Sequence, residues 1–160
     1  MSDGQEPTGG PEATDGLGVE ELGRRLVADM PDALVVSDRD GVIRVWNLAA
    51  TRIFGFSHNE ALGRSLDIIT PENLRARHWT GYRRTMETGR TRYGSGDLLS
   101  VPAICKDGRR ISVQFSIMPL RDAAGRLSGV AAVMRDVTAE FEERKALRAE
   151  LAERKRASGD

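Results

Sequence analysis

The residues best suited to chemistry lie in one stretch, Thr70–Gly89 (TPENLRARHWTGYRRTMETG), where an imidazole stands among guanidinium groups. Four side chains recur at every fourth residue and share one face of a predicted helix: Leu74, His78, Tyr82 and Met86. The arginines that flank this face are Arg75, Arg77, Arg83 and Arg84. A neutral imidazole on a core-facing stripe can ligate a metal, and nearby arginines can bind the carboxylates of a ligand. The alternative interpretation is a hydrogen-bonded core histidine.

The two ends of this stretch carry helix signals. Thr70 is predicted to be the N-cap residue, and Pro71 suits the first helical position. Glu72 places a negative charge in the first turn, where the helix dipole favours it, and Gly89 is a typical helix stop. The sequence therefore predicts one helix of about five turns that carries His78 near its middle.

Composition bounds the class of protein. The chain has 160 residues, of which 39% are hydrophobic and 30% charged, which fits one globular domain with appendages. Lys plus Arg is 24 and Asp plus Glu is 24, so the formal net charge is zero and nothing favours nucleic acid as a partner. Cys105 is the single cysteine, which excludes an internal disulfide and indicates a reducing compartment.

No apolar run approaches the roughly 20 residues that cross a bilayer, and no basic segment followed by an apolar stretch opens the chain. We therefore expect a cytoplasmic protein without a membrane partner. Residues 1–16 are almost free of apolar side chains and are predicted to be a disordered tail. Residues 17–30 form a predicted amphipathic helix, residues 31–137 the domain, and residues 138–160 a charged C-terminal helix.

Alternating and β-branched runs predict five strands, at Ala33–Ser37, Val42–Trp46, within Arg92–Ile104, at Ile111–Leu120 and at Leu127–Met134. Asn47 and Ser57 are predicted to cap two short helices that end at glycines. Two strands, several helices, three strands and a last helix make an α+β protein. We expect a five-stranded antiparallel sheet with helices on one face, flanked by N-terminal and C-terminal helices.

Three segments give the chain a resemblance to the PAS domain family over about Pro31–Thr138. They are WNLAATRIFGFSHNEALGRSL from Trp46, KDGRRISVQFSI from Lys106, and MRDVT from Met134. The resemblance implies a sensor fold whose last strand leads into a signalling helix. It implies little about the ligand, because this fold hosts many ligands.

The segment HWTGYRRTMETGRTR is similar to the His-x-x-Gly-Tyr segment of the haem-binding, FixL-like PAS subgroup. That resemblance implies a b-type haem with His78 as the proximal iron ligand and Tyr82 beside it. Arg84 and Arg92 stand where the subgroup has residues near the haem propionates, and Phe115 and Ile117 stand at its apolar distal wall. A buried imidazole, an apolar strand face and nearby cations agree with these requirements of haem.

One position departs from the oxygen-sensing pattern. The subgroup has a distal arginine on the strand after the helix, whereas Leu98 or Leu99 stands there in GDLLSV. An apolar wall does not stabilise the partial charge on iron-bound oxygen, so carbon monoxide, nitric oxide or a redox signal fits at least as well as oxygen. Tyr93 could instead donate a hydrogen bond, and Met134 stays open as a distal ligand.

The chain carries no catalytic motif, so we expect a sensor and not an enzyme. The predicted terminal helices offer apolar residues for a homodimer, and a separate protein would receive the signal. Two rival hypotheses stay open: a cofactor-free PAS interaction module, and a PAS sensor of another small organic ligand.

Overall fold

The protein, described here by a computed structural model, is a five-stranded antiparallel sheet with helices, and the structure describes residues 18–91 and 99–158. The elements in chain order are α1 (Val19–Asp29), β1 (Ala33–Asp38), β2 (Ile43–Trp46), α2 (Leu48–Phe54), α3 (His58–Ala61), the 3-10 helix η1 (Leu66–Ile68), α4 (Glu72–Thr88), β3 (Leu99–Ile104), β4 (Arg110–Arg121), β5 (Leu127–Asp136) and α5 (Thr138–Ala157). The strand order β2-β1-β5-β4-β3 brings β1 beside β5 at the centre of the sheet. The predicted α+β fold is confirmed.

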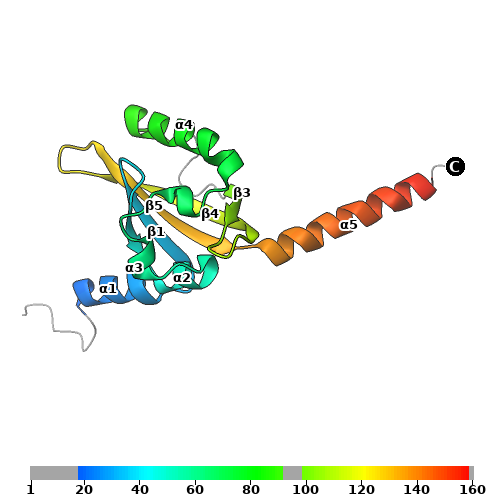
Figure 1. Cartoon of the computed structure of the whole chain (residues 1–160), viewed down its shortest axis with the longest axis horizontal. Helices are drawn as coiled ribbons and strands as arrows, with labels where there is room; N and C mark the ends of the chain where they lie inside the picture. The colour runs from blue at the N-terminus through cyan, green and yellow to red at the C-terminus, as the bar shows by residue number, and fades with distance from the viewer. Residues whose placement is uncertain (1–17, 92–98, 159–160) are drawn as a thin grey trace, which may run out of the picture.

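The helices lie near different ends of the sheet. Figure 1 shows α2 and α3 near one end of the sheet and α4 near the other, while α5 extends away as an arm. The predicted tail, residues 1–16, lies outside the described residues. No described helix is long and apolar enough to span a membrane.

Asn47 organises the junction between β2 and α2, as its capping signal predicts. Its Oδ1 accepts hydrogen bonds from the backbone N–H groups of Ala50 at 3.0 Å and Leu34 at 2.9 Å. Its Nδ2 donates to the carbonyl of Asp32 at 3.0 Å. Asn47 is buried, so its three bonds satisfy the polar atoms of its own side chain. The helix then ends at Gly55, whose φ of 84° is the left-handed conformation that glycine adopts readily.

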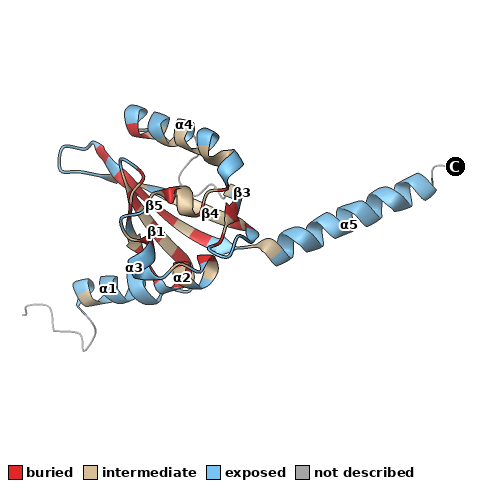
Figure 2. Ribbon diagram, in the orientation of Figure 1, coloured by how far each residue is buried: buried red, intermediate tan, exposed pale blue. Residues whose placement is uncertain are grey.

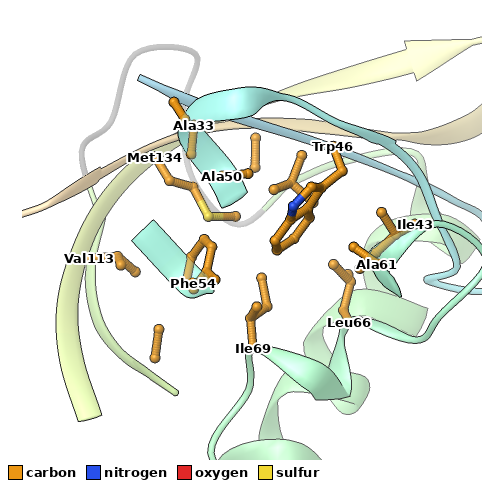
Figure 3. Packing of buried hydrophobic residues seen from close by; sticks show 14 of the residues in the cluster. Ala33, Ile43, Trp46, Ala50, Phe54, Ala61, Leu66, Ile69, Val113 and Met134 are labelled. Carbon is orange, nitrogen blue, oxygen red and sulfur yellow. The ribbon is translucent and has the colours of Figure 1, made fainter. Parts of the chain in front are cut away.

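The main core lies where α2, α3 and η1 cover the sheet. Trp46 and Phe54 are 2% and 0% exposed, and their ring centroids lie 5.5 Å apart. Figure 3 shows both rings among the surrounding apolar side chains, with Ile43, Leu66 and Ile69 beside them. Burial on this scale is the dominant favourable term for folding.

The helix that carries His78 begins one residue later than its sequence signals indicate. Thr70 is not the N-cap: Pro71 precedes the first helical residue, and the Thr70 hydroxyl donates to the carbonyl of Leu66 at 2.9 Å. The prediction failed because η1, which the sequence did not reveal, offers that hydroxyl an acceptor. The predicted stop at Gly89 is confirmed, with a φ of 67°.

Strand β4 shows the predicted alternation, but its inner face changes character along its length. Ile111 and Val113 are buried, whereas Phe115 and Ile117 further along are half-buried (Figure 2). Pro102 sits in β3, an edge strand, where a missing backbone N–H is tolerated.

Candidate functional site

His78 lies on α4 with its ring half-buried. Its Nδ1 is a buried atom with no hydrogen-bond partner in residues 18–91 and 99–158. Burial lowers the pKa of the imidazole below its ordinary value, and the negative charge of Asp67 opposes that shift only in part. At neutral pH the ring is therefore uncharged, which is the form that ligates a metal.

Two aromatic rings surround this imidazole. The Trp79 ring stands edge-on to it with centroids 4.9 Å apart, and the Tyr82 ring lies 5.9 Å away. Trp79 and Tyr82 are themselves 5.5 Å apart, so the three rings form one cluster, in which Trp79 and Tyr82 pack against the buried core. The Trp79 indole N–H donates to Oδ1 of Asp67 at 2.8 Å, which fixes the ring against η1.

Tyr82 reaches across to the sheet. Its hydroxyl lies 2.9 Å from the Ser37 hydroxyl and donates to the Asp38 carbonyl at 2.5 Å. Burial raises the pKa of this phenol, so it stays protonated at neutral pH. Ser37 is a contact that the sequence did not predict, since a single serine in an apolar strand carries no signal of a partner 45 residues away.

The sheet beneath α4 presents an apolar surface. The β-sheet register places Leu99 beside Phe115, and Phe115 beside Met134. Ile117 lies beside Ala132 in the next row, and it packs with Tyr82 against a small buried cluster: Met86, Leu127 and Val130. The predicted wall residues Phe115, Ile117 and Leu99 thus share the inner face of neighbouring strands, each half-buried.

The arginines near His78 in the sequence differ in their exposure and contacts. Arg84 is exposed on α4, and no contact joins it to His78 or to the sheet within the described chain. Arg92, Tyr93 and Leu98 lie outside the described residues. Arg75, which the resemblance did not single out, donates to the carbonyls of Thr70 and Asp67, each at 3.2 Å. It therefore serves the start of the helix.

The remaining candidates lie apart from this cluster. The Cys105 thiol contacts the Ile53 carbonyl at 3.3 Å, and burial raises its pKa, so it is not an activated nucleophile. It borders a depression of about 360 Å³ between α2 and the β3–β4 turn, which His78 does not line. Over the described ranges, no three His, Cys, Asp or Glu side chains are grouped as a metal site.

Comparison with known proteins places this site in context. The chain is 42% identical over 55 residues to Sensor protein FixL of Bradyrhizobium diazoefficiens, a match that spans 34% of this chain and 11% of that protein. It is 28% identical over 123 residues to Oxygen sensor protein DosP of Escherichia coli, spanning 77% of this chain and 15% of that one. The chain thus matches less than a fifth of the length of these curated relatives.

Solved structures give the same fold. A PAS domain from Colwellia psychrerythraea superposes with a TM-score of 0.66 at 18% identity, covering 76% of this chain and 99% of that one. At that identity the likeness concerns the fold alone. The sequence family described as PAS fold matches residues 27–142, which is most of the chain. The protein therefore belongs to the PAS fold family.

Proposed function

We propose that this PAS domain is a haem-based sensor of a diatomic gas or of redox state, with His78 as the iron ligand. The observation that carries the proposal is the buried, uncharged imidazole whose Nδ1 has no partner in the described chain. A structural histidine in a core is expected to be hydrogen-bonded, because an unsatisfied buried polar atom is costly. Within the described residues, the His78 ring lacks such a bond at Nδ1, which favours a ligand role over a structural one.

The surroundings of His78 fit a haem. Haem iron takes an axial ligand from the protein, so a single histidine suffices where no cluster of three ligating side chains is found in the described residues. Phe115, Ile117 and Leu99 provide half-buried apolar side chains for a macrocycle. Arg84, exposed on the same helix, has its guanidinium free to move toward a propionate. When bound, haem supplies an iron centre that binds diatomic gases and changes oxidation state.

The apolar wall bears on the choice of signal. Leu99 offers no hydrogen bond to a polarised gas, and Phe115 and Ile117 are equally apolar. This favours carbon monoxide, nitric oxide or a redox change over faithful oxygen sensing. The similarity to the oxygen sensor DosP keeps oxygen among the ligands to be tested.

The start of α5 is hydrogen-bonded to β4, which offers a route by which a change at the site could reach α5. The Thr138 hydroxyl oxygen accepts from the Ser112 N–H at 2.9 Å, and the Val137 N–H donates to the Ser112 carbonyl at 2.8 Å. Ser112 belongs to β4, the strand that also carries Phe115 and Ile117. A displacement of β4 would thus move α5, and we propose that a separate protein receives this signal without catalysis by this domain.

The test is a visible absorption spectrum of the purified protein before and after addition of hemin. Wild type should give a sharp Soret band and a defined ferrous–CO shift, and His78→Ala should lose both. His58→Ala is the matched control, because it removes the other histidine, an exposed residue whose Nδ1 contacts the Trp46 carbonyl at 2.9 Å. Equal binding by wild type and His78→Ala would defeat the proposal.

A second function, that of a cofactor-free interaction module, is favoured by α1. Its apolar residues Val19 and Leu26 are 87% and 57% exposed, and Phe141 and Leu151 on α5 are 47% and 56% exposed. Such surfaces suit a homodimer. Light scattering at micromolar concentration tests this function: a monomer would count against it.

A further inference from the structure

Polar contacts tie α4 to the rest of the domain along its length. Near its start, Arg75 donates to the carbonyls of Thr70 and Asp67, and Arg110 of β4 donates to Oδ1 of Asn73. Three residues before Tyr82, Trp79 bonds Asp67 of η1 at 2.8 Å. At its end, Nη2 of Arg121 in β4 donates to the Gly89 carbonyl at 2.9 Å. Between them, Tyr82 bonds β1, an inner strand of the sheet. The start and the end of the helix are held by other contacts, whereas Tyr82 ties its second half to an inner strand of the sheet. Tyr82 is therefore placed to decide how closely that part of the helix approaches the sheet.

The Tyr82 hydroxyl contacts β1 through two hydrogen bonds, and each of these bonds is either formed or broken. The Tyr82 hydroxyl donates to the Asp38 carbonyl, so the Ser37 hydroxyl is the donor in the bond between the two side chains. Ser37 is 4% exposed and sits opposite Val130, inside the sheet. Without Tyr82 this serine would need another acceptor or water, since a buried hydroxyl is costly to leave unpaired.

The same contact lies next to His78. Tyr82 is one helical turn beyond His78, and their rings lie 5.9 Å apart. The Tyr82 ring also packs with Ile117 against the buried cluster formed by Met86, Leu127 and Val130. Tyr82 therefore covers part of the sheet surface that a ligand beside His78 would need to reach.

We propose that Tyr82 and Ser37 form a latch that holds α4 closed over the sheet, and that a ligand enters beside His78 only when this latch opens. The first part stands on the geometry alone, whereas the second part rests on the proposed haem site. A closed state that must open before binding lowers the apparent affinity by the fraction of molecules that are open. Removing the latch should raise that fraction.

Two substitutions weaken the latch with little change of shape. Tyr82→Phe keeps the ring and removes both hydrogen bonds of the phenol oxygen, whereas Ser37→Ala removes the bond to Ser37 and leaves the bond from Tyr82 to the Asp38 carbonyl. Thr80→Val is the matched control, because Thr80 is an exposed residue of α4 whose hydroxyl bonds within the helix, to the Ala76 carbonyl at 2.9 Å. Far-UV circular dichroism checks that each variant is folded.

The first measurement is amide hydrogen exchange of the apo protein. Both latch variants should exchange faster over α4, by about three- to tenfold, with β5 unchanged and Thr80→Val like wild type. The double variant should add little to Tyr82→Phe alone, because Tyr82→Phe already removes the bond that Ser37→Ala removes. Unchanged exchange over α4 in both single variants would overturn the latch.

The second measurement is the association rate of hemin by stopped flow. Both latch variants should bind about three- to tenfold faster than wild type and Thr80→Val. Faster exchange without faster binding would overturn the gating role and leave Tyr82 as a structural tie. If wild type itself does not bind hemin, the proposed function fails and gating fails with it, while the exchange result still decides whether Tyr82 holds α4.

Discussion

The two ends of the sheet are built differently. Around α2 the large core side chains Trp46 and Phe54 are 2% and 0% exposed, and the buried Asn47 makes three hydrogen bonds. Under α4 the aromatic side chains are only half-buried, Met86 is the one buried residue of the helix, and the His78 Nδ1 has no partner in the described chain. One end is arranged for stability.

The end under α4 has partly exposed apolar side chains and, among the described residues, an unpaired polar atom, as ligand sites do. Regions with few fully buried contacts open at lower free-energy cost than the core. A domain that must admit a ligand while staying folded gains from placing both properties at separate ends of one sheet. The comparison makes quantitative predictions, because matched side chains are present at each end.

The largest difference is expected between two phenylalanines. Phe54→Ala should lower the free energy of unfolding by about 3–5 kcal/mol, because it leaves a cavity against Trp46 in a close-packed core. Phe115→Ala should cost about 1–2 kcal/mol, since Phe115 is half-buried beneath α4. Urea denaturation of both variants measures the two costs, and equal costs would remove the distinction between the two ends.

The next difference is expected between two polar side chains. Asn47→Ala should cost about 2 kcal/mol, because it removes three hydrogen bonds, one of them to the buried Ala50 N–H at the start of α2. His78→Leu in the apo protein should change stability by less than about 0.5 kcal/mol, since the imidazole has an unpaired nitrogen and leucine replaces it with apolar volume. A cost for His78→Leu as large as that for Asn47→Ala would mark His78 as structural.

Local signals in the sequence predicted the end of the sheet around α2 better than the end under α4. The caps at Asn47 and Ser57 involve neighbours three residues away, and both are confirmed. The alternation along β4 is likewise a property of consecutive residues. Most helices and strands and the fold class could therefore be predicted from local sequence signals.

The contacts that shape the site join residues far apart in the chain. Ser37 and Tyr82 are 45 residues apart, and Trp79 and Asp67 are 12 apart, with no periodic pattern to link them. The misassigned N-cap at Thr70 has the same origin, because its hydroxyl bonds an element that the sequence did not announce. The assignment of His78, Arg84 and Arg92 to haem stays a prediction.

The smallest effect is expected from an ion pair at the surface of the stable end. The Glu60 carboxylate accepts from Nζ of Lys106 at 2.5 Å and from the Ser57 N–H at 2.8 Å. These bonds, the Lys106 bond first, lower the pKa of Glu60 from 4.5 to about 2. The folded state therefore holds this proton less tightly than the unfolded state, and ionised Glu60 favours folding.

The sign of the pH dependence follows from that shift. The contribution of Glu60 is fully present above pH 4.5 and is lost as the pH falls through about 2. Glu60→Gln should therefore show a smaller fall in urea midpoint between pH 7 and pH 3 than wild type. Glu60 and Lys106 are both exposed, so the difference should be small and should shrink further in high salt. Identical falls in the two proteins would mean that the tie between α3 and the β3–β4 turn contributes nothing to stability.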